Sequence, residues 1–364
     1  MSRPLVAEID AAALRHNLGR AREAAPGRPL VAIVKADGYG HGLIRVARAL
    51  ASAEAFGVAC IEEALQLREA GYQHPILLLE GFFDGAELEL VATQRLIAVI
   101  HHEWQLKALE RASLSSAVRV WLKVDTGMHR LGLPPHEVDA ARRRLAACGN
   151  VRGEVVLMTH LANADDREDS TTGRQLALFA AAAGDDAECS IANSAGILGW
   201  PESRRGWLRP GIMLYGASPF RSGVGAEWQL RPVMTLRSRL IAVNRYPRGA
   251  PIGYGGDWRC PEEMPVGVVA VGYGDGYPRH APGGTPVLVN GKRVPLIGRV
   301  SMDMITVDLR TQPDAAVGDP VVLWGQGLPV ECVAERAGTI AYELLCGVAR
   351  GRVRYETVQE REDG

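Results

Sequence analysis

The sequence predicts an α/β protein in which an N-terminal (β/α)₈ barrel of the TIM type precedes a mostly β C-terminal domain. Three observations lead to this fold class. Between residues 30 and 215, short apolar runs alternate with amphipathic segments. After residue 232, alternating β patterns with turn signals replace the helical pattern. The 364 residues are enough for a barrel and an added domain, and we assign residues 1–228 to the barrel and 229–364 to the β domain.

The first part of the chain has the sequence pattern of a parallel sheet, in which buried strands alternate with helices. We expect strands at residues 30–35, 55–60, 75–79, 96–100, 118–124, 153–159, 188–192 and 207–209. We expect helices at residues 42–53, 61–70, 84–93, 103–112, 136–147 and 173–183. Eight alternations in roughly 180 residues favour a closed barrel over an open sheet, and the pattern is weakest at 207–209.

The second part reads as a β domain joined by a flexible linker within residues 220–232, where Ser222 to Gly225 favour a loop. The pair Asn290-Gly291 predicts a two-residue hairpin turn. The expected β segments cover residues 233–244, 265–273, 285–289, 293–309 and 319–324, and a helical pattern returns only near 330–346.

Composition argues against several classes of protein. With 41 basic and 42 acidic residues the chain has no basic surface for nucleic acid. No apolar run approaches the roughly 18 residues of a membrane span, and the start lacks a signal-peptide pattern, so we expect a cytoplasmic protein. The six cysteines include no CxxC pair, and no carboxylate cluster accompanies His101-His102, so we expect no metal.

Lys35 ends the first predicted strand, in the segment LVAIVKADGYGHG at residues 30–42. In barrels of this kind, working residues lie at the carboxyl ends of the strands. A lysine at a strand end more often extends its ammonium group into water. Here three closely spaced glycines let the backbone bend, and Tyr39 and His41 bring polar groups to the same rim. Lys35 is therefore a candidate nucleophile for a carbonyl group.

A carbonyl cofactor that carries a phosphate would also need an anion site, which barrels often build after strands seven and eight. Those loops contain Ser194, whose hydroxyl lies at an expected helix start, and Gly211 and Ile212, whose N–H groups follow a proline. Such residues are common in ordinary turns, so their types alone indicate little. They become candidates because they follow the two predicted strands after which barrels often bind phosphate. No Walker A sequence or GxGxxG motif indicates a nucleotide fold.

The segment AIVKADGYGHG resembles the cofactor-lysine motif of the bacterial alanine racemases, fold-type III isomerases that use pyridoxal 5′-phosphate. The similarity continues in order along almost the whole chain. Further matching segments are WLKVDTGMHRLG (121–132), MTHLANAD (158–165), ANSAG (192–196), LRPGIMLYG (208–216), IGYGGDW (252–258), GYGDGYPR (272–279), GRVSMDM (298–304) and GTIAYELLC (338–346). The architecture of that family agrees with the one predicted above.

The resemblance implies catalytic roles for several residues. Lys35 would hold the cofactor and act as one base, and Tyr254, from the partner subunit of a homodimer, would act as the other. Arg209 would face the pyridine nitrogen, with His160 in support. Lys123 matches a lysine that is carbamylated in some family members, where it positions the arginine that corresponds to Arg130.

The resemblance also implies how cofactor and substrate are held. The cofactor phosphate would bind to Tyr39, Ser194, Gly211, Ile212 and Tyr342. Arg130 would lie near the phenolic oxygen of the cofactor and the carboxylate of the substrate. Met302 would bind that carboxylate through its backbone, and Tyr273, Asp303 and Tyr342 would narrow the entrance.

Two departures from the family pattern stand out: Ser301 replaces a cysteine found in many relatives, and the ending RGRVRYE lacks a proline. The leading interpretation is a racemase that supplies D-alanine for peptidoglycan or degrades it. A broader serine racemase stays open, because a methyl and a hydroxymethyl group are discriminated by only about 1–3 kcal/mol. A decarboxylase of the same fold would place an acidic residue where Arg209 stands, and a non-catalytic cofactor carrier would lack the β domain.

Overall fold

The computed structural model of the protein describes residues 3–184 and 187–358. The described chain divides into two compact units. One, here called the barrel unit, consists of residues 15–184, 187–214 and 219–222. The other, the β unit, consists of residues 3–14, 215–218 and 223–358, so the N-terminal segment belongs with the C-terminal half. A single domain boundary between residues 228 and 229 stays a prediction.

The barrel unit is built on parallel strands that pair in chain order. Within its described residues these strands are β2 (Val31–Ile33), β3 (Ala55–Val58), β4 (Ile76–Leu78), β5 (Ile97–Ile100), β6 (Arg119–Lys123), β7 (Val156–Met158) and β8 (Cys189–Ser190). Nearly all of their residues are buried, as expected where both faces of a parallel sheet are covered. Each is shorter than its predicted run, because residues at the ends of the runs already belong to loops.

The segment 207–210 supplies the eighth side of the ring. Leu208 forms a parallel bridge with Leu30, next to the first strand. On the other side, the N–H of Trp207 donates to the carbonyl of Cys189 at 2.8 Å. The segment is too irregular to count as a strand, in keeping with its weak sequence pattern, yet it is bonded to both neighbours. The (β/α)₈ fold class is confirmed.

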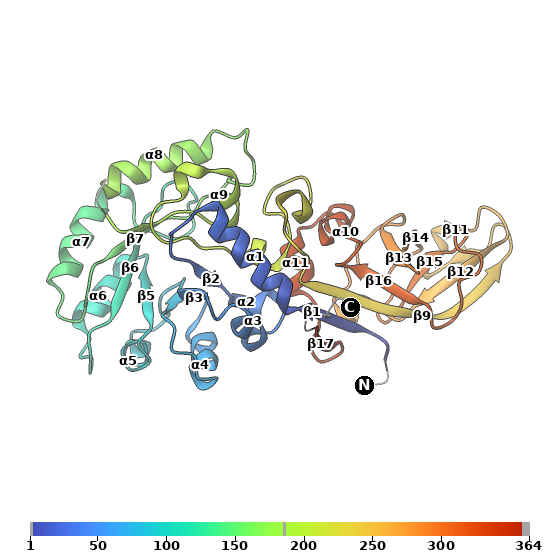
Figure 1. The fold of residues 1–364 in the computed structure, drawn as a ribbon, viewed down its shortest axis with the longest axis horizontal. Coiled ribbons are helices and arrows are strands. Elements are labelled where there is room, and N and C mark those ends of the chain that lie inside the picture. The colour runs from blue at the N-terminus through green and yellow to red at the C-terminus, as the bar shows by residue number, and fades with distance from the viewer. Residues whose placement is uncertain (1–2, 185–186, 359–364) are drawn as a thin grey trace. The chain divides into compact units, whose positions relative to one another are not determined.

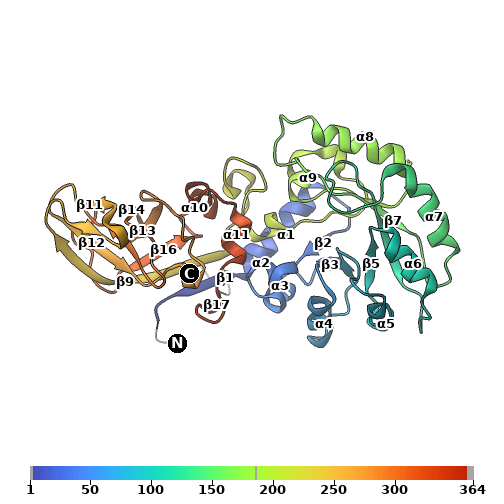
Figure 2. The ribbon, with the colours of Figure 1, turned by 180° about the vertical axis from the view of Figure 1, so that it is seen from behind.

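Helices connect the strands, and Figures 1 and 2 show α4 to α8 along the outside of the barrel. The helices are α1 (Ala11–Ala24), α2 (Lys35–Tyr39), α3 (Leu43–Ala49), α4 (Ile61–Glu69), α5 (Leu88–Thr93), α6 (Glu103–Arg111), α7 (Val138–Ala147), α8 (Thr171–Ala183) and α9 (Ser194–Gly199). All six predicted helices are present. The predicted helices 84–93 and 136–147 start with a short 3₁₀ turn, and the sequence analysis did not predict α1.

The β unit contains one sheet with the strand order β12-β15-β14-β13-β16-β9-β1-β17, and β12 also pairs with β9. The strands from β12 to β9 therefore close into a ring. The bounds are β1 (Val6–Asp10), β9 (Met234–Tyr246), β12 (Met264–Val269), β13 (Pro286–Val289), β14 (Lys292–Ile297), β15 (Ile305–Asp308), β16 (Pro320–Trp324) and β17 (Arg354–Val358). A separate hairpin pairs β10 (Pro251–Ile252) with β11 (Trp258–Arg259), and two helices, α10 (Val330–Ala337) and α11 (Ala341–Cys346), precede β17.

Most predicted β segments are present, with differences in detail. The Asn290-Gly291 turn is confirmed between β13 and β14, and both of its residues have positive φ. The single segment expected at 293–309 is two strands, because the chain turns at Gly298, where φ is 66°. The segment expected at 265–273 ends at Val269, and the helical region divides at Gly338.

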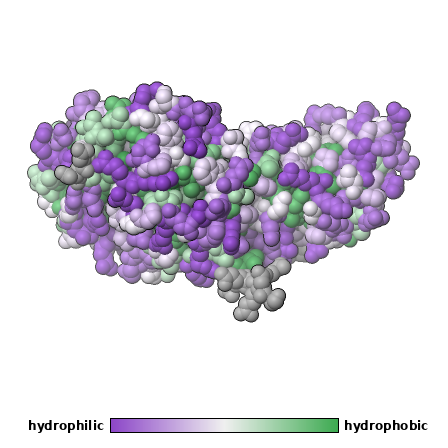
Figure 3. All heavy atoms as spheres, turned by 45° about the horizontal axis from the view of Figure 1, so that its top comes forward, coloured by the Kyte–Doolittle hydropathy of each residue, from purple (hydrophilic) through white to green (hydrophobic). Residues whose placement is uncertain are grey.

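Two further properties of the described residues concern membrane spans and metal sites. No helix among them is long and apolar enough to cross a bilayer. The described part of the chain holds no group of three His, Cys, Asp or Glu side chains arranged to bind a metal ion. The face in Figure 3 is mostly hydrophilic, with apolar side chains exposed in separate places.

Candidate active site

Lys35 lies at the end of the barrel where the strands finish. The strand β2 stops at Ile33, two residues before the predicted end, and Lys35 begins the short helix α2. Residues 36–38 have φ between 51° and 62° with ψ near 47°, and Tyr39 also has positive φ. This is a turn of left-handed helix, which costs roughly 1–2 kcal/mol for each residue other than glycine. Strain of this kind is typical of functional sites.

Specific contacts hold this left-handed turn. The side chain of His41 is fully buried, and its Nδ1 donates to the carbonyl oxygens of Tyr39 at 2.8 Å and Gly38 at 3.1 Å. Burial lowers the pKa of His41 to about 4, although the two carbonyls oppose this, so the ring is neutral at neutral pH. The carboxylate of Asp37 accepts the N–H of Leu43 at 2.7 Å.

Two loops meet beside Tyr39 and form a cradle for an anion. The hydroxyl of Ser194 accepts the N–H groups of Gly211 at 2.9 Å and Met213 at 3.3 Å. A Cβ on Gly211 would lie 2.7 Å from the hydroxyl of Tyr39, so only glycine allows this approach. Ile212 is fully buried, and its N–H has no hydrogen-bond partner among the described residues. Because buried N–H groups are rarely unpaired, this cradle fits a phosphate.

Arg209 is buried in the same end of the barrel. Its guanidinium donates to the carbonyls of Thr159 at 2.6 Å and Ile191 at 3.1 Å, and to the hydroxyl of Ser190. Burial lowers the pKa of Arg209 to about 10, which still leaves the side chain charged at neutral pH. Three neutral acceptors therefore fix a buried cation in one orientation.

Positive charge gathers around Lys123, whose side chain is 7% exposed. Burial lowers its pKa, and so do the nearby charges of Arg209, Arg130 and Lys35, against the opposing charge of Glu80; the resulting pKa is about 8. Lys123 and Arg209 are both buried, and buried cations are unfavourable unless an anion offsets them. The region therefore suits a cofactor with a phosphate and an anionic ring oxygen.

His160 lies among the same cations. Burial, followed by the charges of Arg209, Lys123, Arg130 and Lys35, lowers its pKa well below the usual value, so the ring is neutral. The buried side chain of Gln175 donates to the carbonyl of His160 at 3.0 Å and accepts the N–H of Ala162 at 2.8 Å. This contact fixes the backbone that carries His160.

Arg130 is exposed on the loop that follows β6. The N–H of Leu133 donates to the carbonyl of Lys123 at 2.8 Å, and the N–H of Asp125 donates to that of Leu133 at 2.9 Å, so the loop returns to the strand. The carboxylate of Asp125 accepts the N–H of His129 at 3.0 Å. The loop thus presents Arg130 close enough to Lys123 for its charge to be felt there.

Comparison with known proteins gives the family. Residues 9–219 match the description "Alanine racemase, N-terminal domain", and residues 233–356 match "Alanine racemase, C-terminal domain". The chain belongs to the alanine racemase family. The resemblance expected from the motifs is thereby confirmed.

Individual relatives of this family match nearly all of the chain. The alanine racemase of Nitrosococcus oceani is 58% identical over 345 residues, 95% of this chain and 97% of the relative. The biosynthetic alanine racemase of Escherichia coli is 53% identical over 339 residues, 93% and 94% of the two chains. The crystal structure of the biosynthetic alanine racemase from Pseudomonas aeruginosa has a TM-score of 0.95 and 46% identity, over 98% of this chain and 100% of that one.

The remaining residues that the family resemblance singles out lie in the β unit. Tyr254 is at the tip of the β10–β11 hairpin, between Gly253 and Gly255, which both have φ of 76°. Its side chain is 68% exposed, and its hydroxyl has no hydrogen-bond partner among the described residues. Tyr342 lies in α11. An exposed tyrosine on a glycine turn is available to a partner molecule.

The loops before β15 and after β12 carry Met302, Asp303 and Tyr273. The N–H of Tyr273 donates to the carbonyl of Ser301 at 3.0 Å, and the N–H of Gly274 donates to that of Met302 at 2.9 Å. The N–H groups of Met302 and Asp303 have no hydrogen-bond partner within the described chain. Two adjacent unpaired donors at an exposed turn suit a carboxylate.

Sequence reasoning did not single out Ser190, Thr159 and Gln175 as parts of the site. Ser190 and Thr159 bind Arg209, and Gln175 supports His160. Ser190 and Thr159 lie within predicted strands close to their carboxyl ends, so the rule that led to Lys35 could also have found them. Gln175 lies on α8 and gave no comparable signal.

Proposed function

We propose that this protein interconverts L- and D-alanine with pyridoxal 5′-phosphate bound at the carboxyl ends of the barrel strands. The observation that carries the proposal is the pair of buried cations, Lys123 and Arg209, together with the Ser194–Gly211 cradle, in a chain of the alanine racemase family. The positive charges would attract an anionic cofactor. Lys35, at the same end of the barrel, would react with the carbonyl group of that cofactor.

The cofactor would be held by residues from several barrel strands. Lys35 would bind its carbonyl carbon, and Tyr39, Ser194, Gly211 and Ile212 its phosphate. Arg130 would lie near its phenolic oxygen. When bound, the cofactor supplies an electron-withdrawing ring that makes the α-hydrogen of an amino acid acidic. The residues of this chain then have to orient the substrate and move one proton.

Arg209 would keep the ring nitrogen opposite it unprotonated, because a fixed cation there disfavours a second positive charge. A weaker electron-withdrawing ring disfavours a long-lived carbanion and so limits side transamination. The neutral His160 is consistent with this role, since it adds no positive charge of its own beside Arg209.

Racemisation needs an acid and a base on opposite faces of one carbon. We assign one face to Lys35 and the other to Tyr254 supplied by the partner subunit of a homodimer. The exposure of Tyr254 on its hairpin supports a role toward a second chain. Arg130 and the N–H of Met302 would bind the substrate carboxylate. Tyr273, Asp303 and Tyr342 would narrow the entrance, and Tyr342 would also contact the phosphate.

Alanine is the proposed substrate because the relatives are named for it, and serine is the natural comparison. The product would serve peptidoglycan synthesis, or the reaction would run toward D-alanine degradation. Several relatives are named biosynthetic, which favours the first role. A cytoplasmic location stays a prediction.

Incubation of L-alanine with the protein and pyridoxal 5′-phosphate in D₂O tests the proposal. We expect deuterium at the α-carbon by NMR together with drift to a racemic mixture by chiral chromatography, and slower exchange of L-serine. The Tyr254→Phe variant should lose racemisation, which separates a racemase from a cofactor carrier. Absence of exchange with either amino acid, despite bound cofactor, would exclude the proposed function.

A further inference from the structure

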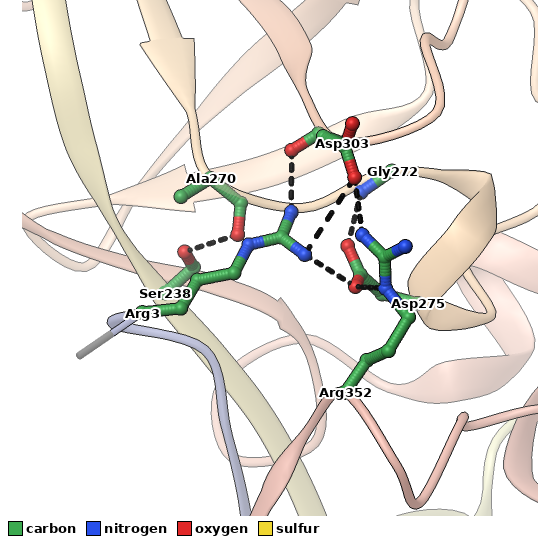
Figure 4. A network of polar contacts seen from close by, with 7 residues as sticks. All are labelled: Arg3, Ser238, Ala270, Gly272, Asp275, Asp303 and Arg352. Atoms are coloured by element: carbon green, nitrogen blue, oxygen red, sulfur yellow. Dashed lines mark hydrogen bonds and ion pairs between the residues drawn. The ribbon is translucent and has the colours of Figure 1, made fainter. Parts of the chain in front are cut away.

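An ion network in the β unit joins two loops to residues near both ends of the described chain (Figure 4). At its centre is Asp275, whose side chain is fully buried. One carboxylate oxygen of Asp275 accepts Arg3 Nη1 at 2.6 Å and Arg352 Nε at 3.0 Å. The other oxygen accepts the N–H of Gly272 at 2.9 Å. We call this arrangement the terminal network.

The same two arginines also hold the neighbouring loop. Arg3 donates from Nη2 to the backbone carbonyl of Asp303 at 2.6 Å. Arg352 donates from Nη2 to the carboxylate of Asp303. Each guanidinium therefore contacts Asp275 with one nitrogen and Asp303 with another, as Figure 4 shows. The planar fork of arginine suits such a double contact, which lysine cannot reproduce.

Strand pairing brings these groups together. β1 pairs in parallel with β17, so the residues before each strand, Arg3 and Arg352, lie at the same edge. β12 pairs with β15, so the loop after one lies beside the loop before the other. The terminal network is thus a consequence of the sheet topology.

The two loops are in direct backbone contact as well. A Cβ on Gly272 would lie 2.3 Å from the carbonyl oxygen of Ser301 and 2.4 Å from that of Met302. These distances leave no room for a side chain. Any shift of the Asp303 backbone is therefore passed to the adjoining Met302 and to the loop 272–276.

We propose that Arg3 and Arg352 are positioning residues that orient the N–H groups of Met302 and Asp303 toward the substrate carboxylate and fix the adjoining loop that carries Tyr273. The inference rests on the proposed function, in which Met302 binds the substrate carboxylate and Tyr273 narrows the entrance. Met302 is 51% exposed at the turn, so little packing would otherwise fix it. Two N–H groups bind one carboxylate well only when both already point toward it before the substrate binds.

Steady-state kinetics of Arg3→Ala and Arg352→Ala, with alanine in both directions, test the proposal. We expect KM to rise on the order of tenfold and kcat to change much less, because the network acts on substrate orientation. Arg3→Lys should lie between Arg3→Ala and wild type. Arg310→Ala is the matched control: Arg310 is as exposed as Arg352 (39% and 40%) and also pairs with one buried and one exposed carboxylate, Asp308 and Glu262. It should leave KM unchanged.

Hydrogen exchange measured by mass spectrometry gives a readout that does not depend on activity. In the arginine variants, exchange should accelerate in peptides covering 272–276 and 301–304 and stay unchanged in β13, β14 and β16. Unchanged KM would overturn the proposal, and so would exchange that rises throughout the β unit, since that would indicate general stabilisation. A wild-type protein inactive on alanine would refute the proposed function, while the exchange data would still show whether the network holds the loops.

Discussion

The surroundings of Lys123 change its acid–base chemistry. Its pKa falls from an ordinary 10.5 to about 8, first because it is buried and then because Arg209, Arg130 and Lys35 are close. Each pKa unit corresponds to about 1.4 kcal/mol, so a charged Lys123 destabilises the cofactor-free fold by about 3 kcal/mol.

The sign of the resulting pH dependence follows from the two pKa values. Below about pH 8 Lys123 is protonated in both states, and the full penalty is present. Between about pH 8 and 10.5 the unfolded chain binds more protons than the folded one, so folding becomes more favourable as pH rises.

We predict that Lys123→Met stabilises the cofactor-free protein at pH 7 by roughly 1–3 kcal/mol, because it removes a buried charge. The advantage should shrink as pH rises from 8 toward 10. Urea unfolding at several pH values measures it. Lys107→Met, which changes an exposed lysine, should show no such trend. An advantage of Lys123→Met that is constant from pH 7 to 10 would contradict the assignment.

At the scale of elements, the left-handed turn of α2 connects the strand that ends at Ile33 to the anion cradle. The turn fixes the positions of Lys35 and Tyr39. The side chain of His41 holds the turn by donating to two of its backbone carbonyls. A ring that is neutral and fully buried acts here as a fixed donor. Loss of that donor would remove the hydrogen bond to the carbonyl of Tyr39, while the carbonyl of Gly38 would keep the backbone N–H of His41 at 3.0 Å.

We predict that His41→Leu loses about 1–3 kcal/mol of folding free energy and binds the cofactor at least severalfold more weakly. His41→Asn should retain most of both, because an amide nitrogen can stand where Nδ1 stands. Unfolding with urea and titration with pyridoxal 5′-phosphate, followed by absorbance, measure the two quantities. Equal cofactor affinity in the Leu and Asn variants would show that the turn does not depend on this hydrogen bond.

The elements also show what sequence can predict. Apolar periodicity located the barrel strands, and Asn290-Gly291 located a hairpin, because both signals are local. The left-handed turn was not predictable, since alanine rarely has positive φ and aspartate has it only in a minority of cases. The break between β14 and β15 was missed because residues 293–309 keep an apolar pattern through the loop. β1 and β17 were also missed.

At the scale of the whole molecule, only part of the candidate site could be predicted from the residues alone. Lys35, Ser194 and Gly211 could be named from the rule that barrel sites lie at strand ends. Tyr254 and Met302 follow no such rule, because they lie on turns of a second unit, and only the family resemblance singled them out. Hydrophobic periodicity reports burial within one chain, so it gives no signal for an exposed residue whose proposed role is in a partner chain.

The assignment of Lys35 and Tyr254 to different subunits has a sharp consequence. We predict that Lys35→Ala and Tyr254→Phe, each nearly inactive alone, regain activity when mixed and allowed to exchange subunits. A mixed dimer would have one intact site and one doubly altered site, so a statistical mixture should reach about a quarter of wild-type activity. Chiral chromatography after re-equilibration measures it, with each variant refolded alone as control. If both residues served the same subunit, every site would keep one lesion, and mixing would restore nothing.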